Sequence, residues 1–211
     1  SLAVSWVFEP SGPAPVPECW TVLSALAAVT SRVMLGPLVL NAANRNPGVL
    51  ANMAATLQEV SGGRLLLGIG AGGSRATPYA AEQDAIGLPP GTDTERRTRV
   101  IDVIATLRRL WSGDPPGFLR PAPPPPIIVG GFGPQMAQVA GRYGDGFNCA
   151  AGHPMLPELV RDARQAHRDS GRTTPFHVTA FGGFPGTEAS RKRLAGLEAH
   201  ALLCLDDADA V

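Results

Sequence analysis

The chain of 211 residues is long enough to bury one hydrophobic core, so we expect a single domain over residues 1–211. Its 18 basic and 18 acidic side chains balance, which argues against a nucleic-acid-binding protein and against binding to an anionic membrane surface. Because no apolar run approaches the ~18 residues that span a bilayer and no signal peptide is recognisable, we expect a soluble, cytoplasmic protein that acts on a small molecule.

Short runs rich in Val, Ile and Leu alternate with segments of helical periodicity, which is typical of βαβ units around a parallel sheet. In chain order, the expected strands cover residues 2–8, 33–40, 65–69, 127–129, 146–150, 176–181 and 201–205. This α/β pattern fits two architectures, a TIM-type (β/α)8 barrel and an open doubly wound sheet. The pattern by itself leaves both open.

Apolar residues recur at helical spacing between these strands. We expect a helix that starts at Pro47, is capped by Asn46 and ends at Gly62. A longer helix follows Thr94, and its apolar stripe should pack into the core: Val100, Val103, Ile104, Leu107, Leu110 and Trp111. Two further helices should bury Met136, Val139, Ala140 and Tyr143, and Leu156, Leu159, Val160 and Ala163, and a last one lies near residues 188–200.

The cysteines and histidines form no recognisable metal motif. Cys19, Cys149 and Cys204 are far apart in the sequence, so we expect them to be reduced, buried and small hydrophobic residues. No histidine pair has the spacing of metal ligands, and no G-x-S-x-G elbow of a serine hydrolase is present.

In parallel α/β proteins, ligands bind at the carboxyl ends of the strands. Glu9 follows the first expected strand, where its carboxylate could contact a cofactor, transfer a proton or simply be solvated. Asn41, Arg45 and Asn46 follow the second, and their amides and guanidinium could meet the polar atoms of a flavin-like ring. Asn46 has the alternative role of a helix cap.

Two glycine-rich loops follow the next strands. Gly70, Ala71 and Gly72 let the backbone approach a planar ring, and the G-x-G-x-x-G pattern around them also leaves an NAD-binding open sheet as an alternative. Its match is weak, because Pro78 and other residues separate the glycines from any helix. The loop Gly130, Gly131, Phe132 and Gly133 runs directly into a helix, where free amides could bind a phosphate.

Several segments in the same order and spacing resemble the luciferase-like monooxygenase family: residues 35–40, 45–47, 54–57, 61–64, 67–72, 110–113, 128–134 and 145–148. The resemblance implies a barrel that holds FMN or the deazaflavin coenzyme F-420 at the carboxyl ends of the strands. It also implies a non-prolyl cis peptide at Leu38–Val39, where a backbone bulge backs the ring of the cofactor.

The resemblance also assigns the candidate catalytic positions. Glu9 stands where many relatives have Asp, and it is followed by Pro10 in place of a histidine; Asn46 stands where flavin-using relatives often have histidine. The first β/α unit of the family barrel is missing ahead of residue 2. We therefore expect an oxidoreductase that transfers a hydride or activates oxygen on a small organic substrate. A flavin-binding protein without turnover is the alternative, and a homodimer is left open.

Overall fold

The structure, a computed structural model, describes residues 2–3, 17–77, 80–181, 196, 200–201 and 203–204. The strands are β1 (Leu2–Ala3), β2 (Leu40–Asn41), β3 (Leu67–Gly70), β4 (Ile127–Gly130), β5 (Gly146–Ala150), β6 (His177–Phe181), β7 (His200–Ala201) and β8 (Leu203–Cys204). The helices are α1 (Cys19–Val29), α2 (Pro47–Val60), α3 (Ala80–Ala85), α4 (Asp93–Ser112), α5 (Pro134–Tyr143) and α6 (Leu156–Asp169). Glu9 and most of the helix expected near residues 188–200 lie outside the described residues.

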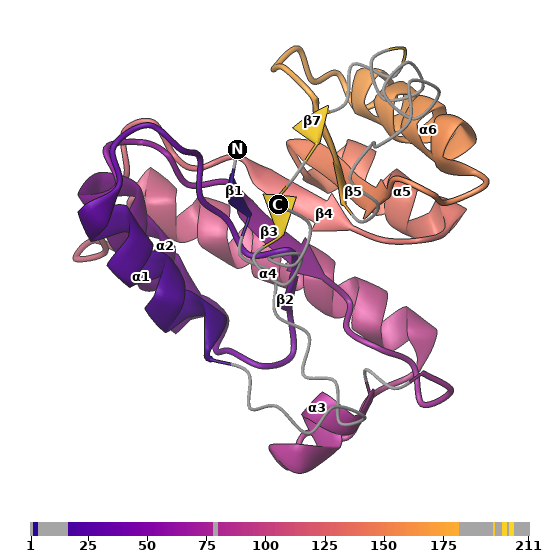
Figure 1. The fold of residues 1–211 in the computed structure, drawn as a ribbon, viewed down its shortest axis with the longest axis horizontal. Coiled ribbons are helices and arrows are strands. Elements are labelled where there is room, and N and C mark those ends of the chain that lie inside the picture. The colour runs from indigo at the N-terminus through magenta and orange to yellow at the C-terminus, as the bar shows by residue number, and fades with distance from the viewer. Residues whose placement is uncertain are drawn as a thin grey trace.

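Six strands form one parallel sheet in the order β2-β3-β4-β5-β6-β7, and β1 pairs with β8 in a separate parallel pair (Figure 1). The order follows the chain and never reverses, whereas a doubly wound sheet reverses its strand order at the ligand crevice. The expected parallel α/β architecture is confirmed, and the open NAD-binding sheet loses its support. Closure into an eight-stranded barrel and the missing first unit stay predictions.

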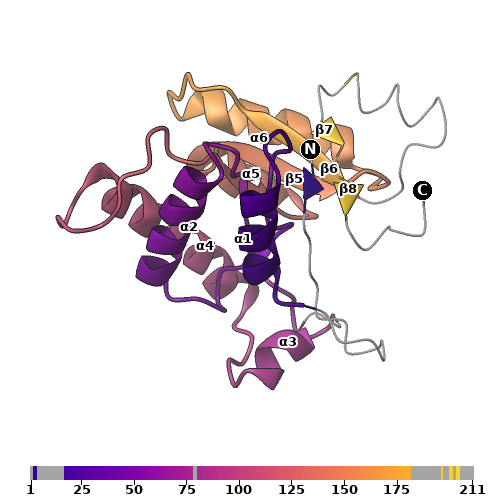
Figure 2. The ribbon, with the colours of Figure 1, turned by 60° about the vertical axis from the view of Figure 1, so that its left-hand side comes forward.

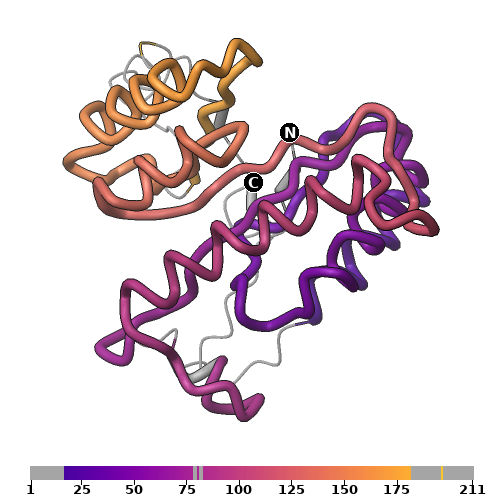
Figure 3. The backbone as a smooth tube through the Cα atoms, turned by 180° about the vertical axis from the view of Figure 1, so that it is seen from behind, coloured from indigo at the N-terminus to yellow at the C-terminus, as the bar shows by residue number. Residues whose placement is uncertain are grey.

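The helices also pack in chain order, because each crossover returns the chain beside the preceding unit. Contacts run from α1 to α2, from α2 to α4, from α4 to α5 and from α5 to α6. In Figure 1 these helices follow the colour gradient from indigo to orange, and seen from behind α4 is the long helix that crosses the middle of the molecule (Figure 3). The short α3, which follows β3 in the chain, lies apart from this row (Figure 2).

Most expected helices are confirmed. Pro47 starts α2 with Asn46 as its N-cap, and all six residues of the α4 stripe are buried. The expected start of α4 after Thr94 was late, because a capping box between Thr92 and Glu95 already starts the helix at Asp93. The pattern analysis did not identify α1 and α3.

The prediction that Tyr143 faces inward was wrong, since its side chain is 39% exposed. The buried residues of α5 are small instead, and a Cβ at Gly141 would lie only 2.2 Å from the backbone oxygen of Ala163 in α6. The two helices therefore pack too closely for a large side chain at their contact. A tyrosine at the last residue of α5 lies beyond it.

The strands present different faces to the two sides of the sheet. Alternate residues pack into the core with the helices: Leu67, Ile69, Ile127, Val129, Phe147, Cys149, Val178 and Ala180. Their neighbours along the strands point to the opposite face, which we call the cavity face: Gly68, Gly70, Ile128, Gly130, Gly146, Asn148, Thr179 and Phe181. The helix side therefore supplies the hydrophobic core, and the glycines are concentrated on the cavity face.

The long strand expected over residues 33–40 is confirmed only in part. Regular pairing is limited to an isolated bridge between Leu35 and Leu65 and to β2. Between them the chain crosses so close to β3 that a Cβ at Gly68 would lie 2.1 Å from the carbonyl oxygen of Pro37. Residues 36–39 thus form a bulge over β3, which the apolar run alone does not reveal.

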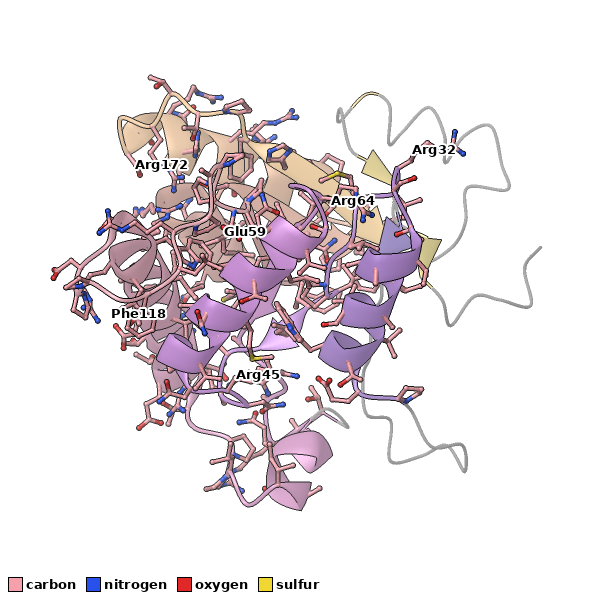
Figure 4. All side chains as sticks on the ribbon, turned by 90° about the vertical axis from the view of Figure 1, so that its left-hand side faces the viewer. Arg32, Arg45, Glu59, Arg64, Phe118 and Arg172 are labelled. Carbon is pink, nitrogen blue, oxygen red and sulfur yellow. The ribbon has the colours of Figure 1, made fainter. Side chains whose placement is uncertain are left out.

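The loop before β3 is held by a buried cation. The guanidinium of Arg64 donates hydrogen bonds to the carbonyl oxygens of Ala27, Thr30, Val33 and Ser61, and to the hydroxyl of Thr30, at 2.6–3.0 Å. Figure 4 shows Arg64 at the opposite end of α1 and α2 from Arg45. Because helix C-termini leave carbonyls without intrahelical partners, Arg64 ties the end of α1 to the sheet.

Candidate functional site

Five residues on the cavity face lie side by side across the sheet. The register pairs Asn41 with Gly70, Gly70 with Gly130, Gly130 with Asn148, and Asn148 with Thr179. We call this set the central row. Its two glycines leave space that side chains would otherwise fill, and its two asparagines flank that space.

The space above the glycines is occupied by one residue of the bulge. A Cβ at Gly70 would lie 2.6 Å from a methyl carbon of Val39, and one at Gly130 would lie 2.8 Å from the same carbon. The peptide bond Leu38–Val39 is cis, which confirms the expectation from the family resemblance. Glycine is therefore required at both positions because the bulge rests directly on the sheet.

A cavity of about 500 Å³ opens beside this bulge. It is lined by Leu38, Val39, Leu40, Asn41, Gly70, Ala71, Gly72, Gly73, Asp93, Arg96, Arg97, Gly130, Gly131, Phe132, Gly133, Pro134, Gln135, Met136, Asn148 and Phe181. Its size falls within the range of about 300–1,000 Å³ that is usual for small-molecule sites. The cavity brings together predicted residues from three loops: Leu38, Val39, Asn41, Gly70, Ala71, Gly72, Gly130, Gly131, Phe132 and Gly133.

Asn41 presents a directed hydrogen-bond donor at this cavity. Its side-chain oxygen accepts a hydrogen bond from the backbone N–H of Ala43 at 2.9 Å, which fixes the orientation of the amide. Its nitrogen Nδ2 is buried and has no hydrogen-bond partner in the protein. A buried donor without a partner carries a desolvation cost, so this atom suits a carbonyl oxygen or ring nitrogen of a bound ligand.

The loop after β3 is shaped around that amide. Gly72 has a φ of +70°, and a Cβ there would lie 2.3 Å from Nδ2 of Asn41. Arg96 holds the loop from the other side, because one of its nitrogens donates to the carbonyl oxygen of Gly72 at 2.6 Å and another pairs with Asp93 at 2.6 Å. The Arg96 side chain is only 14% exposed, so α4 fixes the position of this loop.

The loop after β4 leads directly into α5. Gly133 is the N-cap of α5 and forms no side-chain cap, and Pro134 occupies the first turn. The backbone N–H of Gly131 donates to the carbonyl of Asn148 at 3.0 Å, which fixes the loop against β5. The first amides of a helix lack intrahelical acceptors and carry partial positive charge, so the N–H groups of Gln135 and Met136 can receive an anion here.

Three predicted site residues lie elsewhere. Glu9 is outside the described residues. Asn46 does not line the cavity, and its side chain caps α2 by accepting from the N–H groups of Gly48 and Val49. Arg45 is also absent from the cavity wall and forms an ion pair with Glu18.

Glu18 is the N-cap of α1, which makes its pair with Arg45 a link between α1 and the loop after β2. Partial burial raises the pKa of the Glu18 carboxyl, but hydrogen bonds from Thr21 and Trp20 and the charge of Arg45 outweigh it. The net result is a pKa below the ordinary 4.5. The described contacts of Arg45 are thus those of an anchor between two elements.

Some residues of the cavity wall were missed by the sequence analysis. Asn148 stands near a strand end, and the rule that selected Asn41 could have found it. Phe181 ends β6, and its ring packs against Leu38 and Val39. Arg96 lies inside a helix far from any strand end in the sequence, so only the packing of α4 reveals its position.

Within the described ranges, no group of three or more His, Cys, Asp or Glu side chains is arranged to hold a metal ion. In the same part of the chain, no helix combines the length and the apolar character needed to cross a membrane. Cys19 and Cys149 are free and buried, as expected.

Residues 2–194 match the model of the luciferase-like monooxygenase family. Among curated proteins, the chain is 35% identical over 178 residues to an F-420-dependent glucose-6-phosphate dehydrogenase of Beutenbergia cavernae, covering 74% of this chain and 51% of that protein. A protein of the same description from Kineococcus radiotolerans is 34% identical over 194 residues, covering 82% of this chain and 55% of that protein. The chain thus spans about half the length of the curated relatives it matches.

Solved structures share the fold. An F-420-dependent secondary alcohol dehydrogenase in complex with an F-420–acetone adduct has a TM-score of 0.71 at 22% identity, covering 92% of this chain and 64% of that chain. The oxygenating constituent of 3,6-diketocamphane monooxygenase from Pseudomonas putida, in complex with FMN, has a TM-score of 0.65 at 19% identity, covering 92% of this chain and 60% of that chain. At these identities the likeness concerns the fold alone.

Proposed function

Because the chain belongs to the luciferase-like monooxygenase family, we propose that the cavity beside the Leu38–Val39 bulge binds the ring of coenzyme F-420 or FMN. The protein is then an oxidoreductase that acts on a small organic molecule. When bound, the coenzyme supplies two-electron hydride transfer, or oxygen activation in the case of FMN. The residues of this chain bind and orient the ring.

The observation that carries the proposal is the unpartnered, buried Nδ2 of Asn41 at the edge of a glycine-floored cavity. The central row leaves room for a flat group beside Val39, and the Asn41 amide gives that group a hydrogen-bond donor. The loop of Gly130 to Gly133 offers amides to a phosphate at the start of α5. Together these features suit a planar polar ring joined to an anionic tail.

We propose F-420 as the coenzyme ahead of FMN. The curated relatives at 32–35% identity are described as F-420-dependent dehydrogenases. FMN is the second candidate, since the FMN complex of the camphane monooxygenase has the same fold. A coenzyme-binding protein without turnover is the remaining alternative, and it differs in a single result: reduction of the bound coenzyme by no substrate.

The test is a titration of the purified protein with F-420 and with FMN, followed by absorbance and fluorescence. We expect saturable binding of F-420 and at least tenfold weaker binding of FMN, a difference of about 1.4 kcal/mol. Tighter binding of FMN would reverse the choice of coenzyme. Absence of binding to both would overturn the proposed function.

The Asn41→Asp variant tests the site itself. The carboxylate still accepts from the N–H of Ala43, but the donor that faces the cavity becomes an acceptor. We expect the affinity for the coenzyme to fall at least about tenfold, because a hydrogen bond is lost and two acceptors face each other. Asn52→Asp is the matched control, since it adds the same charge at an exposed position of α2. Equal affinities of the two variants would contradict the role of Asn41.

A further inference from the structure

Three rings meet at the mouth of the cavity. Phe132 from the loop after β4 lies 6.2 Å from Phe181 at the end of β6, with an interplanar angle of 74°. His153 from the loop after β5 lies 6.0 Å from Phe132 on another side, with an angle of 44°. We call these residues the aromatic cluster. They come from three consecutive units of the sheet, so the fold and not a local motif assembles them.

Phe132 is 55% exposed although it lines the cavity, and its neighbours offer it aromatic edges and faces. Phe181 lies on the cavity face one level beyond the central row, because it pairs with Ala150 where Thr179 pairs with Asn148. Its ring packs against Leu38 and Val39 of the bulge. The cluster therefore begins where the proposed position of the coenzyme ring ends.

The charged side chains of the described cavity wall lie at a different place. Asp93, Arg96 and Arg97 all come from the first turns of α4, which follows β3 in the chain. Arg96 is already bonded to Asp93 and Gly72, and Arg97 donates to the hydroxyl of Thr94 at 3.1 Å. The part of the wall around Phe181 is instead made of Phe132, Met136 and Leu38, so it offers apolar contacts.

We propose that the aromatic cluster is the substrate subsite and that it receives a neutral, ring-bearing organic molecule instead of a sugar phosphate. This inference rests on the proposed function, which places the coenzyme ring beside the bulge. Aromatic edge-to-face contacts stabilise a ring at such a site beyond the burial of its area. A phosphate dianion would have to leave water without a cation beside it at this wall, which is costly.

The experiment measures binding of two probes, 1-phenylethanol and glucose 6-phosphate, to the protein with and without coenzyme, by calorimetry and saturation-transfer NMR. We expect 1-phenylethanol to bind at least tenfold more tightly than glucose 6-phosphate. Phe132→Ala should weaken binding of 1-phenylethanol about fivefold or more. Phe181→Leu, which keeps an apolar side chain in β6, should act in the same direction. Tyr143→Ala, which removes a partly exposed aromatic ring outside the cavity wall, should leave binding unchanged.

Equal or tighter binding of glucose 6-phosphate, no binding of 1-phenylethanol, or unchanged affinity in both phenylalanine variants would each overturn the subsite. A coenzyme titration on the same samples separates this inference from the proposed function. Coenzyme binding without 1-phenylethanol binding removes the subsite alone. Binding of 1-phenylethanol that depends on Phe132 and Phe181, in protein that binds neither coenzyme, supports the subsite and removes the proposed function.

Discussion

The two ends of the same parallel strands differ in how completely their polar groups are bonded. At the amino end of β3, Arg64 is buried without an acidic partner, yet four carbonyls and a hydroxyl accept from its guanidinium. At the carboxyl end of β2, Asn41 is equally buried, at 9% exposure for both residues, but its Nδ2 has no acceptor.

The difference separates a stabilising device from a binding site. A buried polar group with all its partners contributes to stability, and one with an open hydrogen bond carries a cost that only a ligand or water can remove. The glycines follow the same division, since Gly70 and Gly130 make room at the carboxyl end for the bulge and the cavity. Substitutions at the two ends should therefore affect different measurements.

The largest expected effect is on folding, from Arg64→Ala. The substitution leaves several buried carbonyls of α1 and of the loop before β3 without donors, so we expect a loss of about 3 kcal/mol or more of unfolding free energy. Urea denaturation measures it. Arg32→Ala is the control, because Arg32 is an exposed arginine near the same end of α1. A loss below 1 kcal/mol for Arg64→Ala would mean that water replaces the guanidinium without cost.

The next effect concerns the contact between the bulge and the sheet. Gly70→Ala places a Cβ 2.6 Å from a methyl group of Val39, and overpacking of this kind costs about 1–3 kcal/mol. In the Val39→Ala background the nearest atom of that residue is its Cβ at 3.9 Å, an ordinary contact. We therefore expect the second substitution to remove most of the penalty in a double-mutant cycle. Additive losses would show that the bulge does not rest on Gly70.

A smaller effect is expected on coenzyme affinity alone, at the start of α5. A Cβ at Gly133 meets no atom within 4 Å, and its φ of −142° suits any residue. Asp and Asn are both good N-caps, so Gly133→Asp and Gly133→Asn should keep or raise stability. If a phosphate binds there, the aspartate should weaken coenzyme binding about tenfold relative to the asparagine. Equal affinities would move the phosphate elsewhere.

The smallest effect is a pH dependence at Glu18. Its pKa in the folded protein lies below 4.5, so its contribution to stability is fully present above pH 4.5 and is lost as the pH falls through the folded pKa. Because the side chain is 45% exposed, we expect Glu18→Gln to cost less than about 1 kcal/mol at neutral pH. The difference from the wild type should shrink in acid. A constant difference from pH 7 to pH 3 would show that the charge of Glu18 is irrelevant.

The aromatic cluster and the asparagines show how far a sequence can predict a site. Asn41 and the glycine loops follow predicted strands, and parallel pairing brings strand ends to one edge, so they were found in advance. Phe181 ends a predicted strand too, but an apolar residue there looks like part of the core. Arg96 has no sequence signal at all, since its distance from β3 along the chain hides its contact with Gly72.

The sequence by itself determined the parallel α/β class, the buried stripe of α4, the cap at Asn46 and the family, because periodicity, capping and motif spacing are local properties of the chain. Only the tertiary structure decided that Val39 fills the space above Gly70 and Gly130, and that Arg45 pairs with Glu18 away from the cavity. These are contacts between residues distant in sequence. They depend on strand register and helix packing, which no local pattern encodes.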